Sequence, residues 1–323
     1  MNIKELIPFL NKRWNNDSKR AFLCRIARFG VIACFYPSWQ YKSSKFDGRI
    51  CSQEFIHGSW MILYEKDKGV SRELLINKTR EPYAVAILPN IIQKGNTVVD
   101  IGANIGYYAL QECSLVGNTG HVYAIEPVST NIQILNKNIK LNHYENISTY
   151  KLACGEKNTK GNINVSVKGN WSSLSKSLNR TYLREEEVDI VTLDKFLIGK
   201  PNPQLIRMDV EGYEYNIVLG MKNLLESKIP LKLLIEVHFD ILMEKVLNLF
   251  EILQDYGFEI SMASIEPHPW IIKSKLGQNI VKKIENGIGP VTGYNNLKIN
   301  DILENPKFSK GQVEYMEILF ERN

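Results

Sequence analysis

The residue types best suited to chemistry lie where two apolar segments end. The stretch VVDIGANIGYYAL, residues 98–110, runs from β-branched residues through a glycine loop into a helical pattern, and Asp100 stands directly before the loop. A second acid, Glu126, ends the next apolar segment. In an open α/β sheet a ligand binds beyond the carboxyl ends of the strands, and the loop after the first strand usually contributes to its site. The loop is therefore predicted to bind a ligand.

The spacing of this loop argues against a dinucleotide. The nicotinamide fingerprint is G-x-G-x-x-G, whose middle glycine lets the backbone approach a pyrophosphate. Here Asn104 takes that position, between Gly102 and Gly106. The carboxylate of Asp100 would also repel a pyrophosphate, whereas it favours a cationic ligand such as the ammonium and sulfonium of S-adenosylmethionine. An NAD-dependent oxidoreductase is the alternative that Asn104 and Asp100 disfavour.

An acid at the end of the second strand has a separate task in such sites, because it can accept hydrogen bonds from the hydroxyls of a ribose. Glu126 occupies that place. Each feature alone also fits a tight turn without a ligand, but their combination at successive strand ends favours a binding site. We therefore predict that S-adenosylmethionine is bound by Asp100, Gly102, Asn104, Gly106 and Glu126.

A second group of polar residues follows two later apolar segments. Asp209 and Glu211 lie in RMDVEGYE, after one predicted strand, and Glu236 and His238 lie on one side of the next, LLIEVH. An alcohol must lose its proton to accept a methyl group, and a general base can take that proton. His238 is the preferred base because its ordinary pKa lies near neutrality. We predict catalytic roles for Asp209, Glu211 and His238.

The same groups allow other interpretations. The carboxylates and the imidazole can hold a divalent metal that lowers the pKa of a hydroxyl, although we do not expect a metal. His238 can also be a structural residue that only hydrogen-bonds to neighbouring acids. The loop lacks the D-P-P-Y or N-P-P-Y sequence that receives an exocyclic base nitrogen in amino methyltransferases, so an amine of DNA or RNA is disfavoured as the acceptor.

Strands and helices must alternate to bring these groups together, and the chain from Glu81 onward has that pattern. The predicted strands are residues 97–102, 121–127, 147–154, 204–212 and 231–238, with a last strand over 313–321 at a sheet edge. The predicted helices are residues 105–117, 131–142, capped by Ser129 or Thr130, and 213–227. The polar stretch 169–180 is expected to be a loop. These elements predict an α/β fold with a doubly wound, mostly parallel sheet.

Residues 1–80 are predicted to form an N-terminal accessory segment before a domain that spans residues 81–323. The segment holds 15 Lys and Arg against 7 Asp and Glu, whereas the whole chain has a net charge of only +5. We expect a basic amphipathic helix near residues 20–37 and a β-hairpin over residues 59–76. The helix is too short and too charged to span a bilayer. Packing on the protein is its default role, and peripheral membrane contact is the alternative.

Residues 81–238 resemble the FkbM family of S-adenosylmethionine-dependent methyltransferases. The similarity rests on VVDIGANIGYYAL, HVYAIEPVSTNIQILNKNIKLN, the SSL of the polar loop, VTLDKF and IRMDVEGYEYNIVLGM. The resemblance implies a class I methyltransferase fold with a Rossmann-like sheet, and methyl transfer to a hydroxyl of a polyketide or a sugar. It places the cofactor positions on the five residues named above and the acidic motif on Asp209 and Glu211. Members often have Lys where this chain has Arg207, a cation that cannot deprotonate and prefers fork-like pairing with carboxylates.

The sequence thus predicts an S-adenosylmethionine-dependent O-methyltransferase that acts on a glycan, a lipid-linked sugar or a polyketide-like small molecule. An RNA methyltransferase is the alternative that the basic N-terminal segment suggests, although nucleic acid is disfavoured as a partner. A non-catalytic S-adenosylmethionine-binding protein is a third interpretation, which the acidic cluster disfavours. Five widely spaced cysteines without zinc-like spacing indicate reduced thiols in a cytoplasmic protein, with any membrane contact only peripheral.

Overall fold

The structure, a computed structural model, describes most of the chain after residue 43. The described residues are 44–46, 49–65, 67–166, 171–175, 181–264, 280–285, 290–294, 298–304, 308, 310 and 313–323. The basic helix predicted near residues 20–37 lies outside them. Residues 45–323 form one unit by their internal contacts. Among the described helices, none has the length and apolar character that crossing a bilayer requires.

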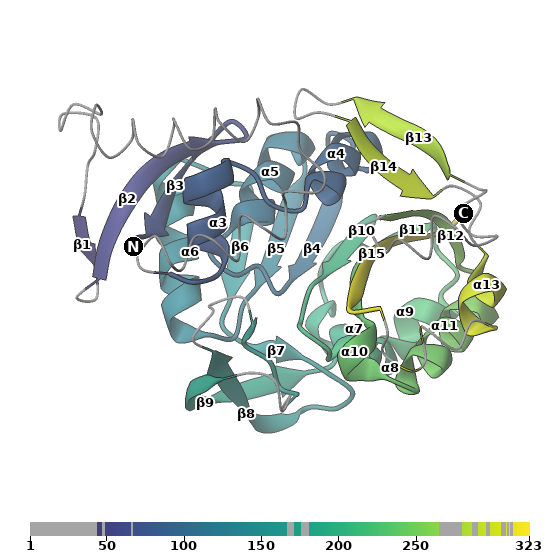
Figure 1. Cartoon of the computed structure of the whole chain (residues 1–323). Helices are drawn as coiled ribbons and strands as arrows, with labels where there is room; N and C mark the ends of the chain where they lie inside the picture. The colour runs from purple at the N-terminus through teal and green to yellow at the C-terminus, as the bar shows by residue number, and fades with distance from the viewer. Residues whose placement is uncertain are drawn as a thin grey trace. The chain divides into compact units, whose positions relative to one another are not determined.

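A nine-stranded sheet carries the predicted strand ends. Its order is β13-β14-β12-β15-β11-β10-β4-β5-β6 (Figure 1). Its strands are β4 (Thr97–Ile101), β5 (His121–Ile125), β6 (Ile147–Tyr150), β10 (Leu205–Met208), β11 (Leu231–His238), β12 (Glu259–Ser264), β13 (Ile280–Glu285), β14 (Pro290–Tyr294) and β15 (Tyr315–Arg322). The five strands β6, β5, β4, β10 and β11 pair in parallel. The winding direction reverses between β4 and β10, which confirms the predicted doubly wound, class I methyltransferase fold.

The last strand does not lie where the sequence analysis placed it. β15 was expected at a sheet edge, but it inserts between β11 and β12 and pairs antiparallel with both. Its residues Met316–Phe320 are buried, as a strand with a neighbour on each side requires. The apolar run predicts the strand, whereas its position depends on pairing with residues far away in the sequence.

Helices cover both faces of this sheet. Those before β10 are α3 (Val70–Asn77), α4 (Pro82–Ile91), α5 (Tyr107–Val116), α6 (Ser129–Leu141) and α7 (Leu193–Phe196). Those after it are α8 (Glu214–Leu219), α9 (Lys222–Glu226), α10 (Phe239–Leu242), α11 (Lys245–Asp255) and α13 (Ile299–Leu303). The single helix predicted over 213–227 is thus two helices. They separate at Gly220, where a Cβ atom would overlap the carbonyl oxygen of Gly155.

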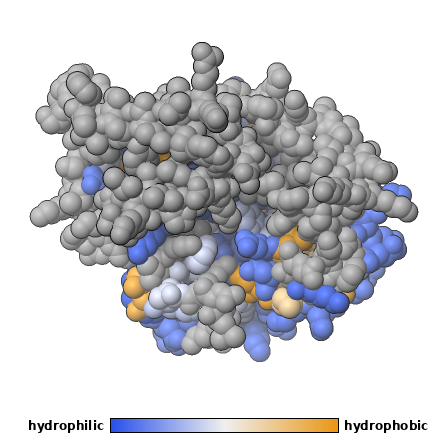
Figure 2. Space-filling view, in the orientation of Figure 1, coloured by the Kyte–Doolittle hydropathy of each residue, from blue (hydrophilic) through white to orange (hydrophobic). Residues whose placement is uncertain are grey.

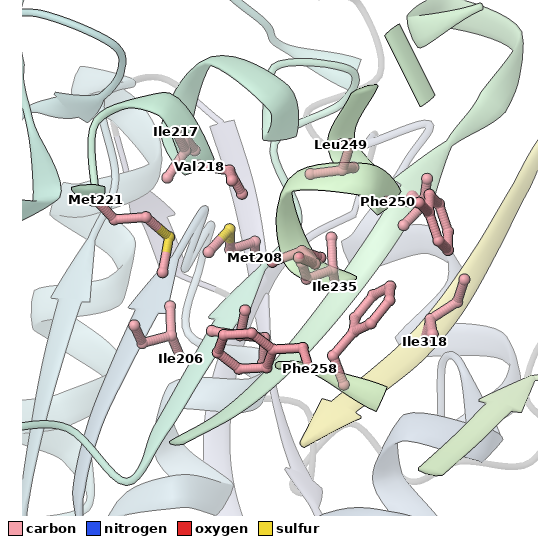
Figure 3. Close-up of a cluster of buried hydrophobic side chains, with 14 of the residues drawn as sticks. Ile206, Met208, Ile217, Val218, Met221, Ile235, Leu249, Phe250, Phe258 and Ile318 are labelled. Atoms are coloured by element: carbon pink, nitrogen blue, oxygen red, sulfur yellow. The ribbon is translucent and has the colours of Figure 1, made fainter. Parts of the chain in front are cut away.

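The alternation of side chains along the strands creates two cores. Ile206 and Met208 of β10 and Ile235 of β11 face α8, α9 and α11, and Figure 3 shows them in one cluster of buried side chains that also includes Ile217 of α8 and Phe250 of α11. The intervening residues Leu205 and Leu234 face the other core, which α4 and α5 cover. Burial on both faces explains why these strands read as continuous apolar runs.

The predicted hairpin over residues 59–76 is only half correct. The hairpin pairs β2 (Arg49–Ile56) with β3 (Ser59–Tyr64), and a short β1 (Ser44–Phe46) lies beside β2. Its turn is His57-Gly58, where both φ angles are positive, as a two-residue hairpin turn of type I′ requires. The second half of the predicted hairpin is the helix α3, because Val70 and Leu74 are buried at helical spacing and the Asp67 carboxylate accepts from Ser71 N.

The hairpin packs on the main sheet's helices. The side-chain amide oxygens of Asn138 and Asn142 in and after α6 accept hydrogen bonds from the backbone N–H groups of Ile62 and Trp60, each at 2.7 Å. Residues 45–80 therefore belong to the same packed unit as the sheet.

A small three-stranded sheet, ordered β7-β9-β8, was not predicted. It consists of β7 (Ala153–Cys154), β8 (Thr159–Ser166) and β9 (Tyr182–Val191). The strand predicted over 147–154 therefore divides into β6 and β7, which lie in different sheets. The charged run over 184–187 in β9 is mostly exposed and has no alternating apolar pattern, so no periodicity predicts a strand there. Because β7 follows β6 directly, this sheet lies beyond the carboxyl ends of the parallel strands (Figure 1).

The predicted N-cap of the helix α6, Ser129 or Thr130, is not the residue that caps it. The helix α6 begins at Ser129, with Val128 as its N-cap residue and no side-chain cap of its own. Its first backbone N–H groups are satisfied from outside the helix, since Glu126 accepts from Val128 N and Glu186 of β9 accepts from Ser129 N. Carboxylates near a helix N-terminus also interact favourably with the helix dipole.

The described surface is mostly polar. In the orientation of Figure 2 it is blue and white, with only small orange patches. The exposed large apolar residues in the described ranges are Phe55, Trp60, Leu183, Ile198 and Met243.

Removing one buried ring should test the packing of the larger core. Phe250 is fully buried and its ring centroid lies 5.3 Å from that of Phe320. We expect Phe250→Ala to lower the free energy of unfolding by about 3–5 kcal/mol through lost burial and a residual cavity. Phe55→Ala is the control: its side chain is 57% exposed, so a change of only about 0.5 kcal/mol is expected. Equal losses in urea unfolding would contradict this account of the core.

Candidate active site

A cavity opens at the carboxyl ends of β4, β5 and β10. It encloses about 790 Å³ of empty space, part of it continuous with solvent, within the range of roughly 300–1,000 Å³ typical for small-molecule sites. Its wall includes Gly102, Asn104, Glu126 and Asp209 from the sequence prediction. The remaining predicted residues, Asp100, Gly106, Glu211 and His238, lie outside the lining. The structure thus brings half of the predicted site to the cavity wall and places the other half behind it.

The glycine loop after β4 needs its glycines for packing. Gly102 has φ +88°, and a Cβ atom there would overlap the carbonyl oxygen of Asp209, so the loop presses directly on the loop after β10. Gly106 has φ +95°, and a Cβ atom would lie 2.6 Å from Cδ1 of Leu135 in α6. Asn104 between them also takes a left-handed φ of +50°, which Asn adopts more readily than most residues. The backbone N–H of Gly102 donates to Ile125 O of β5 at 2.9 Å.

Glu126 connects the glycine loop to the start of α6. Its Oε2 accepts from the backbone N–H of Asn104 at 2.9 Å. Its Oε1 accepts from Val128 N at 2.8 Å and from Asn131 Nδ2 at 3.2 Å. A carboxylate has about four lone-pair positions, so the protein occupies three of them. Glu126 can therefore accept one further strong hydrogen bond, and this bond goes to Oε2.

Burial controls the charge of Glu126. The side chain is only 4% exposed. Desolvation raises its pKa to about 7, although the three hydrogen bonds from Val128, Asn104 and Asn131 counteract the rise. The carboxylate is thus near half-ionised at neutral pH, and any ligand that donates a hydrogen bond to it will favour the charged form.

Arg207 holds two of the predicted acids together. Its Nη1 lies 3.2 Å from Oδ1 of Asp100, and its Nη2 lies 3.1 Å from Oδ2 of Asp209. The fork-like pairing with carboxylates that distinguishes Arg from Lys is therefore present, as the sequence analysis expected. Asp100 is fully buried and its carboxylate points to Arg207 instead of lining the cavity. Burial raises the pKa of Asp100 despite the neighbouring guanidinium.

Asp209 is the acid that faces the cavity. Burial would raise the pKa of its carboxyl, but the positive charges of Arg207 and Arg80 outweigh that effect and the pKa lies below its usual range. Asp209 thus contributes negative charge at a wall that also includes Glu126, and Asp100 lies behind it on the other side of Arg207.

A cationic and aromatic wall was missed by the sequence analysis. Arg80, Tyr107 and Tyr108 line the cavity. The hydroxyl of Tyr107 accepts from Arg80 N and donates to Arg80 O, each at 3.0 Å. Tyr108 donates to Glu81 at 2.7 Å, and the Arg207 guanidinium carbon lies 3.7 Å from the centre of its ring. Arg80 and Glu81 belong to no sequence motif. They lie between two predicted elements, outside the periodic patterns of apolar residues.

His238 lies between two carboxylates. Its Nε2 is 3.2 Å from Oε2 of Glu211 and its Nδ1 is 2.8 Å from Oε1 of Glu214. Burial lowers the pKa of the imidazole, but Glu211 and Glu214 outweigh burial and raise the pKa well above its ordinary value. Glu214 was also missed, although its position three residues after Glu211 was a usable signal.

This environment differs from the one expected for a general base at His238. A doubly protonated imidazolium has no lone pair and cannot take a proton from a substrate hydroxyl. The sequence analysis favoured His238 as the base because of its ordinary pKa, which two carboxylates from a neighbouring loop and helix override. The contacts of His238 with Glu211 and Glu214 are those of the alternative interpretation, in which the histidine only hydrogen-bonds to neighbouring acids.

Comparison with known proteins gives the family of this site. The family model described as the methyltransferase FkbM domain matches residues 100–260. These residues form an FkbM methyltransferase domain. The match covers the glycine loop, Glu126, the acidic loop after β10 and His238.

Curated relatives match a shorter stretch of the chain. A protein-L-isoaspartate O-methyltransferase of Methanosarcina mazei is 38% identical over 69 residues, which are 21% of this chain and 28% of that protein. The enzyme of the same name from Methanothrix thermoacetophila is 30% identical over 69 residues, 21% of this chain and 33% of that protein. The chain thus spans about a third or less of the length of these relatives. The crystal structure of an FkbM methyltransferase from Methylobacillus flagellatus is 22% identical, with a TM-score of 0.32, and covers 44% of this chain and 32% of that one.

The polar stretch of the FkbM domain contacts the acidic loop. The hydroxyl of Ser173 donates to Val210 O at 3.2 Å, and the hydroxyl of Ser175 donates to Gly212 O at 3.1 Å. The backbone of Ser173 also forms an isolated bridge with Asn164 of β8. The SSL sequence, expected only to be a loop, therefore couples the small sheet to the residues after β10.

Substituting Gly102 should separate the effect of backbone strain from the effect of the close approach. Gly199 is the matched control, since it also has a positive φ, +76°, but no atom lies within 4 Å of a Cβ built there. Gly199→Ala should cost about 1 kcal/mol in free energy of unfolding. Gly102→Ala must also displace the loop after β10 and should cost at least about 2 kcal/mol more. Similar losses for both variants in urea unfolding would show that the close approach is unimportant.

The protonation state of His238 can be observed directly. We expect long-range ¹H–¹⁵N spectra at pH 7.5 to show both ring nitrogens of His238 protonated. His121, whose pKa is lowered by burial, should be neutral in the same spectra and serves as the internal control. A neutral His238 tautomer at this pH would restore its role as a base.

The same shift has a consequence for stability. Because the folded pKa of His238 lies above the unfolded value, its ion pairs contribute full stability below pH about 6.5 and lose it as the pH rises through the folded pKa. The stability difference between wild type and His238→Gln should therefore shrink at alkaline pH.

Proposed function

We propose that this chain transfers a methyl group from S-adenosylmethionine to a hydroxyl on a glycan, a lipid-linked sugar or a polyketide-like small molecule. The observation that carries the proposal is the shared cavity at the winding reversal, which brings the glycine loop, Glu126 and Asp209 to one wall. The membership of residues 100–260 in the FkbM methyltransferase family supports it.

The residues around the cavity fit S-adenosylmethionine. Glu126 has one acceptor position left on Oε2, which suits a ribose hydroxyl. Apolar side chains of Ile125, Ala153, Ile163 and Leu174 offer a surface for an adenine ring. When bound, the cofactor supplies an electrophilic methyl group on a sulfonium. The positive charge of that group suits a wall where Asp209 contributes a carboxylate.

Asp209 is the residue best placed to serve the acceptor. It is the predicted catalytic residue that lines the cavity, and its depressed pKa keeps it ionised at neutral pH. An ionised carboxylate can accept a hydrogen bond from an acceptor hydroxyl and take its proton as the oxygen–carbon bond forms and the carbon–sulfur bond breaks. Glu211 and His238 then position the loop that carries Asp209. Both curated relatives are O-methyltransferases, which supports oxygen as the acceptor atom.

Cofactor binding should depend on pH through Glu126. Its carboxyl has a pKa of about 7, and a ribose hydroxyl favours the ionised form. The affinity for S-adenosylhomocysteine should therefore fall nearly tenfold for each pH unit below 7 and level off above it, with about one proton released on binding at low pH. Glu126→Gln should bind at least about tenfold more weakly and lose the pH dependence. Calorimetry in two buffers of different ionisation enthalpy measures both effects.

A labelling experiment with wild type and Glu126→Gln can identify the class of methyl acceptor. Wild-type protein is incubated with methyl-labelled S-adenosylmethionine and a lysate of the source cell, and lipid, glycan, small-molecule and RNA fractions are separated. We expect label in a glycan, lipid or small-molecule fraction, and none with Glu126→Gln. Label in RNA alone would favour the RNA methyltransferase alternative. Wild-type protein that binds no S-adenosylhomocysteine at any pH between 6 and 8 would remove the proposal.

Cytoplasmic location and peripheral membrane contact through residues 20–37 stay predictions of the sequence. They concern residues outside the described ranges, so the proposed function does not depend on them.

A further inference from the structure

A group of ligand-type atoms lies behind the cavity wall. Asp209, Glu211 and His238 each place one carboxylate oxygen or ring nitrogen within 4.8 Å of the others. They come from two elements, since Asp209 and Glu211 lie in the loop after β10 and His238 ends β11. Two carboxylates with one imidazole form a donor set that suits a hard or borderline divalent cation.

The histidine is oriented as a metal ligand usually is. Its Nδ1 contacts Oε1 of Glu214 at 2.8 Å, and the same oxygen accepts from the backbone N–H of Gly212 at 3.1 Å. This carboxylate fixes the ring so that Nε2 faces Glu211. A carboxylate on the far nitrogen is the common outer partner of a metal-bound histidine.

A second observation concerns a buried carboxylate oxygen near Asp209. Glu236 of β11 is 5% exposed, and among the described residues its Oε2 has no hydrogen-bond partner. Its carboxylate lies within 4.8 Å of those of Asp209 and Glu81. A buried carboxylate oxygen without a partner is costly unless a proton or a cation satisfies it.

We propose that Asp209, Glu211 and His238 bind one divalent cation of the Mn²⁺ or Mg²⁺ class, with Glu236 beside it. This revises the expectation from the sequence, which was no metal. Arg207 donates to Oδ2 of Asp209, and the side chains of Asp209 and Glu236 share a hydrogen bond.

The inference also deepens the proposed function, on which it rests. Asp209 lines the cavity, so the cation lies next to the acceptor hydroxyl and lowers its pKa. This requirement favours acceptors whose oxygen can reach a metal, such as a hydroxyl with an oxygen on the neighbouring carbon.

Titration of wild type with Mn²⁺, in the presence and absence of S-adenosylhomocysteine, should show one ion per chain. Asp209→Asn and His238→Gln should weaken Mn²⁺ binding at least about tenfold. Glu214→Gln should weaken it by about 10- to 100-fold through the ring orientation.

Glu112→Gln is the matched control. Glu112 is a fully buried acid of α5 outside the set, so its removal should leave Mn²⁺ affinity unchanged. Thermal unfolding establishes that each variant is folded. The site can also be tested on the wild type alone by NMR. Mn²⁺ should broaden the imidazole signals of His238 and leave those of His121 sharp.

The outcomes separate the two proposals. Wild type that binds S-adenosylhomocysteine but no Mn²⁺ at millimolar concentration, or whose Mn²⁺ affinity is unchanged in Asp209→Asn and His238→Gln, overturns the metal site and leaves the methyltransferase proposal standing. Binding of Mn²⁺ by these residues without any binding of S-adenosylhomocysteine supports the metal site and overturns the proposed function.

Discussion

The buried guanidinium of Arg207 joins the two halves of the site. It lies on β10 directly opposite Asp100 of β4 in the parallel register, and it reaches Asp209 two residues further along the chain, in the loop after β10. These are the two strands between which the winding reverses. Each of the three side chains is costly to bury alone, and removal of one partner would leave an uncompensated charge. The ion pairs therefore fix the relation between the loop after β4 and the loop after β10.

Contacts between these loops extend the same constraint to the ligand. Gly102 touches the backbone of Asp209, while Glu126 holds the glycine loop from the other side. The carboxylates thus have separate tasks. Glu126 has a single acceptor position left for a ligand, Asp100 only supports Arg207, and Asp209 faces the cavity. Behind Asp209, the imidazole of His238 lies between the carboxylates of Glu211 and Glu214.

Local pattern predicted much of this architecture. The parallel strands are buried on both faces and read as apolar runs, and the glycine loop, the acid after β5 and the acidic loop after β10 follow from residue types at strand ends. The pattern of apolar residues did not predict the position of β15 within the sheet, because strand neighbours depend on pairing between distant segments. The helix α3 was mistaken for half of a hairpin, since so short a segment with apolar residues at both ends fits either period. The charged strand β9 gave no signal, because its first half faces solvent on both sides.

By itself, the sequence determined which chemical groups stand at which strand ends, and so the fold class and the chemistry that the site can support. The tertiary structure decided what state those groups are in. Asp100 pairs with Arg207, Glu126 has a pKa of about 7, and two neighbouring acids raise the pKa of His238 well above its ordinary value. The reason is physical: a pKa depends on burial and on charges within a few ångströms, and here those charges come from residues that are remote along the chain.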